Sequence, residues 1–219
     1  MTSAYQEELG VLNDQLVEIA NLVGTAMNWA TKALLTADLT RAESVIQDDD
    51  RIDAMTSALE ERCFDLIEQQ QPSDRDLRYL IGALRIAASL ERMGDLARHV
   101  AKQMRLRYPR LTVPDELHST FTLMGSIAEA IVSKTGEVIR TQDVTLAADI
   151  SVSDEEMDRL HRELFSIVMS NDWTHGVEAA IDVTLLSRYY ERYADHAVSV
   201  TRRVISSVTG EPYAGIALD

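Results

Sequence analysis

The sequence predicts an all-α protein built as two tandem three-helix bundles. Apolar residues recur every three or four positions along most of the 219-residue chain, and no stretch alternates strictly between apolar and polar as a half-buried strand would. Gly and Pro are rare, with 9 and 4 residues, and aromatic residues make up only 5% of the chain, which favours helices packed by small and aliphatic side chains. The second half of the chain also repeats the first.

Three long helices are predicted in the first half. Asp38 is placed to cap the second of them, and Pro72 ends it. Ser73, with Asp76 three residues later, resembles a capping box that opens the third helix. The predicted helices cover about residues 4–36, 39–70 and 74–108.

Three more helices are predicted after a linker that is bracketed by Pro109 and Pro114. We therefore expect a first bundle in residues 1–109 and a second, with a short C-terminal tail, in residues 110–219. The fourth helix begins near Asp115, the fifth runs from its cap Asp143 to about Ser170, and the sixth follows a turn at 171–176 and ends near Val208.

Matched residues indicate that the chain contains an internal duplication. Identical residues are separated by 105 positions in the second helix of each half and by 100 positions in the third helix. The change of five falls in the turn between these helices, where length varies most easily. The matched acidic residues are Asp49, Asp53, Glu91 and Asp95 in the first half and Asp154, Asp158, Glu191 and Asp195 in the second.

These acids form pairs spaced four residues apart, which places both members ~40° apart around a helix and ~6 Å apart along it. Asp49 and Asp154 occupy places on the apolar stripes of their helices. Burying a carboxylate costs several kcal/mol unless it is paired or coordinated. Four acids brought together would therefore take up protons or bind a hard cation such as Mg²⁺, Ca²⁺, Mn²⁺ or Fe³⁺. The alternative is that they lie on solvated faces and pair with neighbouring arginines.

Composition excludes several classes of protein. A formal charge of -15 argues against direct nucleic-acid binding, which requires clustered Lys and Arg. The longest uncharged run, Ile19–Thr31, has 13 residues and is too short to span a bilayer, and no secretion signal opens the chain, so we expect no membrane insertion. Cys63 is the only cysteine, so the chain cannot form an intrachain disulfide, and the cytoplasm is the expected location. We expect Cys63 to be a small residue of the core.

Four short stretches are distinctive: Asp76–Arg78 (DLR), Leu90–Ala97 (LERMGDLA), Arg188–Ala197 (RYYERYADHA) and Val208–Glu211 (VTGE). With these stretches the chain resembles, over about residues 4–211, the PhoU family of phosphate-uptake regulators. The resemblance implies that the protein is not an enzyme but a cytoplasmic negative regulator. Such a regulator links the ATPase of a phosphate ABC transporter to a two-component sensor histidine kinase. It also implies metal clusters (Fe, Mn, Mg, Ca or Zn) at the eight matched acids. The second half departs from the family pattern, with Gly-Val-Glu at 176–178 where the first half has Asp-Leu-Arg.

Two alternatives remain open at this point. A ferritin-like carboxylate-bridged di-metal enzyme would need Glu-x-x-His motifs on two helices, and His161, three residues after Asp158, is the one partial match. A metal-free helical scaffold is the other. The long amphipathic helices have more apolar stripe than packing within the chain would cover. We therefore also expect a homodimer.

Overall fold

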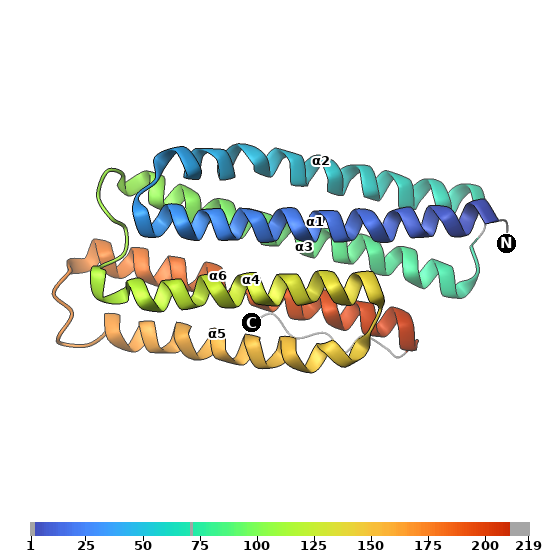
Figure 1. The fold of residues 1–219 in the computed structure, drawn as a ribbon. Coiled ribbons are helices and arrows are strands. Elements are labelled where there is room, and N and C mark those ends of the chain that lie inside the picture. The colour runs from blue at the N-terminus through green and yellow to red at the C-terminus, as the bar shows by residue number, and fades with distance from the viewer. Residues whose placement is uncertain (1–2, 71, 211–219) are drawn as a thin grey trace.

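The computed structural model describes residues 3–70 and 72–210, and these residues form six long helices and no strand (Figure 1). The predicted all-α class with two tandem three-helix bundles is confirmed. The helices are α1 (Ser3–Thr36), α2 (Leu39–Gln70), α3 (Asp74–Arg107), α4 (His118–Thr141), α5 (Ala147–Val168) and α6 (Gly176–Thr209). The predicted C-terminal tail at 211–219, including Glu211 of the last family-like stretch, lies outside the described residues.

Side-chain caps fix the starts of α2 and α3 as the sequence predicts. The Asp38 carboxylate accepts a hydrogen bond from the Arg41 backbone N–H at 3.0 Å. The Ser73 hydroxyl accepts from the Asp76 backbone N–H and donates to the Asp76 carboxylate at 2.8 Å, so both predicted caps are confirmed.

Helices α4 and α5 begin differently from the prediction. Each is preceded by a short 3₁₀ turn, η1 (Asp115–Leu117) and η2 (Val144–Leu146). The Asp143 carboxylate caps η2, accepting from the Thr145 N–H at 2.9 Å and from its hydroxyl at 2.7 Å. Helix α5 also ends at Val168, slightly short of the expected Ser170. Short 3₁₀ segments are frequent at helix ends, and helical periodicity does not distinguish them from the α-helix.

The two three-helix sets lie side by side, with α1–α3 above α4–α6 in Figure 1. Helix α1 packs along α4, and α3 packs along α6, so that buried apolar side chains of both sets form a single core. The hydroxyls of Thr31 in α1 and Tyr190 in α6 lie 2.7 Å apart inside this core, and Phe121 of α4 meets the edge of the Tyr190 ring. Residues of both halves therefore share one interior.

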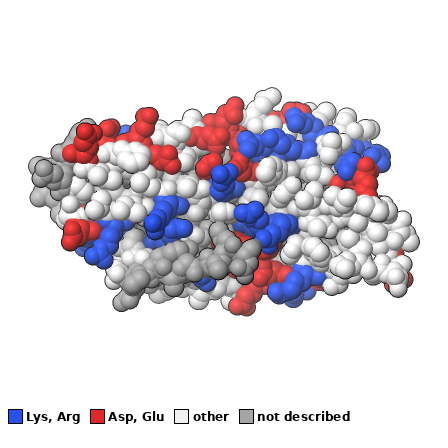
Figure 2. Space-filling view, turned by 180° about the vertical axis from the view of Figure 1, so that it is seen from behind, with Lys and Arg blue, Asp and Glu red and all other residues white. Residues whose placement is uncertain are grey.

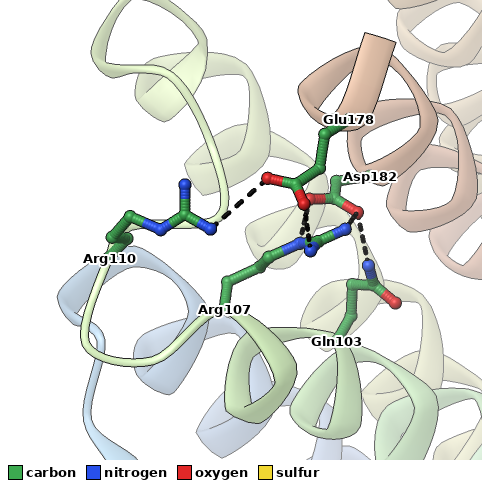
Figure 3. A network of polar contacts seen from close by, with 5 residues as sticks. All are labelled: Gln103, Arg107, Arg110, Glu178 and Asp182. Carbon is green, nitrogen blue, oxygen red and sulfur yellow. Dashed lines mark hydrogen bonds and ion pairs between the residues drawn. The ribbon is translucent and has the colours of Figure 1, made fainter.

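A polar network around the buried Asp182 joins the end of α3 to the start of α6 (Figure 3). Arg107 donates to both carboxylate oxygens of Asp182, at 2.6 and 2.9 Å, and Gln103 donates to one of them at 2.6 Å. Arg107 also pairs with Glu178 at 2.6 Å, and Arg110 of the linker reaches Glu178 at 3.4 Å. The Asp182 side chain is only 3% exposed, so this network fixes the two halves against each other at the linker end.

None of the helices in the ranges 3–70 and 72–210 combines the length and the apolar character that crossing a membrane would require.

Candidate functional site

The structure places the eight predicted acids on four helices, with two on each. Each pair is separated by one helical turn, as the spacing predicts. Helix α2 carries Asp49 and Asp53, α3 carries Glu91 and Asp95, α5 carries Asp154 and Asp158, and α6 carries Glu191 and Asp195. In each half the two helices pack together, and carboxylates of one helix contribute to the raised pKa of an acid on the other, as Asp95 does for Asp49 and Asp195 for Asp154. We call the two groups the first and second acidic clusters.

In the first acidic cluster, an arginine lies between acids of two helices. Arg98 of α3 pairs with Asp49 of α2, with 2.5 Å between Nη1 and Oδ2, and also with Asp95, one turn away on its own helix. Asp49 is only 3% exposed, while Arg98 is 25% exposed and Asp53 is exposed. Gly94 allows this approach, because a Cβ there would lie 3.3 Å from Asp49 Oδ1 and 3.1 Å from the Ile52 side chain.

The second acidic cluster is arranged without such a bridge. Arg188 pairs with Glu191 one turn later on α6, and Arg162 lies 4.0 Å from Asp158 on α5. Within the described part of the chain, no ion pair joins Asp154 or Asp195 to a basic side chain. Oδ1 of Asp154 and Oε2 of Glu191 are buried and have no hydrogen-bond partner among the described residues.

Burial and mutual repulsion oppose ionisation of these acids. Burial, followed by the carboxylates of Asp195 and Asp158, raises the pKa of Asp154 from 3.8 to about 6. Burial and then Asp195 raise the pKa of Glu191 from 4.5 to about 7. In the first cluster burial raises the pKa of Asp49 to about 6, although Arg98 acts in the opposite direction. Burial also raises the pKa of Glu91. Binding of a proton or a cation to such carboxylates stabilises the folded state.

The donor sets can be tested against a metal ion. Among residues 3–70 and 72–210, no group of three or more His, Cys, Asp or Glu side chains is arranged to hold one. The first cluster does not fit an added cation, because Arg98 already lies between Asp49 and Asp95. Buried carboxylate oxygens that lack a hydrogen-bond partner among the described residues occur in both clusters, Oδ2 of Asp49 in the first and Oδ1 of Asp154 and Oε2 of Glu191 in the second.

Charged side chains of both signs lie on one face of the molecule. On the face shown in Figure 2, acidic side chains lie in several small groups, and basic side chains border those near the middle of the face. Among the basic residues, Arg98, Arg188 and Arg162 pair with acids of the two clusters and therefore belong to the description of the site.

Arg98 and Asp182 are residues that the sequence reasoning did not single out. A signal for Arg98 was present in the repeat itself: the equivalent residue 100 positions later is Val198, so a charged and an apolar residue occupy matched places beside matched acids. Asp182 lies among apolar residues early in α6 and gave no such signal.

The remaining titratable candidates take structural positions. His161 contacts the Ser187 hydroxyl at 2.9 Å and the edge of the Phe165 ring. His99 lies against Tyr189. Cys63 is fully buried, and burial raises the pKa of its thiol to about 11, which confirms the prediction of a core residue.

Comparison with known proteins identifies the family. A sequence model described as the PhoU domain matches the chain twice, over residues 16–104 and 121–204. The phosphate-specific transport system accessory protein PhoU homolog 2 of Mycobacterium tuberculosis is 47% identical over 210 residues, covering 96% of this chain and 99% of that protein. PhoU homolog 1 of the same species is 42% identical, with 96% and 95% coverage.

Solved structures agree at the level of the fold. The crystal structure of PhoU from Pseudomonas aeruginosa, 27% identical, matches 94% of this chain and all of its own with a TM-score of 0.82. A phosphate transport system regulatory protein PhoU from Streptococcus pneumoniae matches 97% of this chain and all of its own with a TM-score of 0.84. Two domain matches and relatives that align over nearly the whole chain establish that this protein belongs to the PhoU family.

Proposed function

We propose that this protein is a cytoplasmic negative regulator of phosphate uptake and of phosphate-starvation signalling. The observation that carries the proposal is the 47% identity, over almost the full length of both chains, to a phosphate-specific transport system accessory protein. The protein acts by binding and not by catalysis. It serves as an adaptor between the ATPase of a phosphate ABC transporter and a sensor histidine kinase.

An adaptor transmits a signal only if it binds two states of its partner with different affinity. In this proposal the helical surfaces favour the phosphate-replete form of the transporter and hold the kinase in its non-signalling state. The shared core and the buried Arg107–Asp182 network suit this role, because they keep the two halves at a fixed relative position.

The test is deletion of the gene in its host, followed by growth at high phosphate. Loss of the regulator is expected to leave phosphate uptake and starvation-gene expression switched on, and a plasmid copy of the wild-type gene is expected to restore repression. Unchanged uptake and unchanged expression in the deletion strain would contradict the proposal.

Metal binding is the second part of the proposal. The second acidic cluster would hold a hard cation through carboxylate oxygens, and that ion would offset the repulsion between the acids and stabilise the pairing of α5 with α6. A metal-free scaffold is the competing function, and the Arg98 bridge between Asp49 and Asp95 favours it for the first half.

Elemental analysis of protein purified without chelators separates these two possibilities. The metal-binding adaptor is expected to retain Fe, Mn, Mg, Ca or Zn, and to lose regulatory function when Glu91, Asp95, Glu191 and Asp195 are all changed to Ala. Absence of metal together with full function of that variant would favour the scaffold.

We also infer that the protein is a homodimer. Large apolar side chains are exposed at the end of the molecule where α5 is joined to α6, and such patches mark interaction surfaces. Met169 and Val177 are 78% and 76% exposed, and Ile181 and Phe165 are 52% and 41% exposed. Sedimentation equilibrium should give twice the chain mass for the wild type, and Ile181→Glu should lower it; a wild-type monomer at all concentrations would exclude the dimer.

A further inference from the structure

The line along which α3 packs against α6, which we call the α3–α6 seam, lies on the face shown in Figure 2, where basic side chains gather near the middle. The two helices run in opposite directions (Figure 1), and two contacts fix their register. A Cβ on Gly82 would lie 3.8 Å from the Ser207 side chain, and the His99 ring lies 5.3 Å from the Tyr189 ring. Arg92, between these contacts on α3, therefore lies beside the middle of α6.

Each helix presents a stripe without acids to this seam. Side chains three, four or seven residues apart share one face of a helix. The stripes consist of Arg85, Arg92 and His99 on α3 and of Arg192, His196, Ser199 and Arg203 on α6. The whole chain has 36 acidic residues and only 21 lysines and arginines, so a surface stripe with four arginines and no acid departs from its average character.

The guanidinium groups at the middle of the seam surround one histidine. Burial, followed by the charges of three arginines, lowers the pKa of the His196 ring to about 4; the arginines are Arg192, Arg92 and Arg203. The ring is therefore uncharged at neutral pH, and arginines of both helices lie near it. Like charges gathered in this way repel one another.

Neighbouring acids neutralise only part of this positive charge. Arg92 pairs with Asp95, with 2.7 Å between Nη1 and Oδ2, but Asp95 also pairs with Arg98. Arg192 is exposed, and within the described ranges no ion pair joins it to Asp195, three residues later, or to another acid. A bound anion would offset the remaining repulsion between the arginines.

We propose that the α3–α6 seam binds inorganic phosphate, held by the guanidinium groups of Arg92 and Arg192. The planar fork of an arginine donates parallel hydrogen bonds to two phosphate oxygens. These two residues are the matched arginines of the duplicated Glu-Arg-x-x-Asp motif, and neither acidic cluster accounts for both of them. The choice of phosphate among oxyanions rests on the proposed function, to which the site adds direct sensing of the ion by the regulator.

The experiment measures phosphate binding to the purified full-length protein by isothermal titration calorimetry near neutral pH. A chelator is present, so that no metal ion on the acidic clusters can hold the anion, and sodium chloride keeps the ionic strength constant. The wild type is expected to bind phosphate saturably. Arg192→Gln is expected to weaken binding about 10- to 100-fold, the range for loss of hydrogen bonds to a charged group.

Two further variants separate a specific site from a general effect of charge. Arg159→Gln removes the same charge from α5, where Arg159 is 53% exposed and pairs with Glu156 and Glu163. It is expected to leave binding within about twofold of wild type, because distant surface charges are screened by salt. Arg192→Lys keeps the charge but not the fork, so its affinity should fall between those of Arg192→Gln and wild type. Circular dichroism checks each fold; where Arg192→Gln fails to fold, Arg192→Lys carries the same test.

Three results would overturn the inference. No saturable binding to the wild type at millimolar phosphate would remove the site. Equal weakening by Arg192→Gln and Arg159→Gln would reduce it to a general attraction of charge. A phosphoserine peptide that binds much more tightly than phosphate, and is lost in Arg192→Gln, would assign the seam to a phosphorylated partner. In each case a deletion strain with deregulated phosphate uptake would leave the regulator role intact, so the two failures are distinguishable.

Discussion

At the level of single residues, the acids of the second cluster make stability depend on pH. The folded state raises the pKa of Asp154 from 3.8 to about 6 and that of Glu191 from 4.5 to about 7. At a pH between the unfolded and the folded pKa of each acid, the folded protein holds a proton that the unfolded chain has released. The contribution of these two acids to the free energy of unfolding is therefore fully present below about pH 4 and is lost as the pH rises toward 7.

We predict that, without metal, the contribution of these acids lowers the free energy of unfolding as pH rises from about 4.5 to about 7, and that Asp154→Asn makes the pH dependence less steep. Urea denaturation at a series of pH values, with a chelator present, measures this. Asp149→Asn is the control, because Asp149 lies on the same helix but is 64% exposed and pairs with Lys134. An unchanged slope in Asp154→Asn would show that the acid is not strained by its surroundings.

At the level of helix pairs, glycine sets how closely α1 and α4 approach. A Cβ on Gly125 would lie 2.5 Å from Thr31 Cγ2 and 3.1 Å from its Oγ1. Thr31 cannot move away easily, because its branched side chain is restricted and its hydroxyl contacts both the Met27 carbonyl and the buried Tyr190 hydroxyl. The close approach therefore depends on the missing side chain.

Gly125→Ala is expected to destabilise the protein by about 1–3 kcal/mol through overpacking, which exceeds the gain of up to about 1 kcal/mol from better helix propensity. Gly10→Ala is the matched control, since Gly10 lies in α1 with nothing within 4 Å of the new Cβ. This control should be neutral or slightly stabilising. Urea denaturation compares the two, and a Gly125→Ala protein as stable as wild type would contradict the packing argument.

The network at the linker end of α3 and α6 should be sensitive to loss of one partner. Arg107→Ala leaves Asp182, 3% exposed, without its bidentate partner and is expected to lower the melting temperature clearly, because the buried carboxylate then lacks its positive counterpart. Arg110→Ala removes an exposed contact to Glu178 and should cost less than about 1 kcal/mol. If thermal melting gives equal losses, the buried pair is not what fixes the two helices. Replacing Arg107 by Met together with Asp182 by Leu should recover much of the loss.

The sequence predicted the elements better than their mutual arrangement. The caps at Asp38 and Ser73 were predictable because capping depends on a few neighbouring residues. The eight acids were found because the duplication repeats their spacing. The Arg98 bridge was not predicted, because it depends on how α2 and α3 are rotated against each other, and a periodic pattern leaves that rotation open. The left-handed residues after α1 and α4, Ala37 and Gln142, are not the usual glycine and gave no signal.

At the level of the whole molecule, the duplication raises the question of whether the halves unfold separately. Independent domains have their own cores and few contacts between them. Here α1 packs along α4 and α3 along α6, and the buried apolar residues of both halves form one cluster. Separating the halves would expose the buried Tyr190 of α6, whose hydroxyl lies 2.7 Å from the hydroxyl of the buried Thr31 in α1. The structure therefore favours a single cooperative unit.

The two tryptophans allow this to be measured, because Trp29 lies in α1 and Trp173 lies just before α6. Trp29→Phe leaves a fluorescence probe in the second half, and Trp173→Phe leaves one in the first. We predict that urea unfolding followed by fluorescence in each variant coincides with its own helix loss measured by circular dichroism, as two-state unfolding requires. Transitions that separate in either variant would mean that the halves unfold one after the other. Loss of the Trp173 indole N–H bond to the Gly176 carbonyl, 2.9 Å long, should lower the midpoint of Trp173→Phe slightly without separating its two transitions.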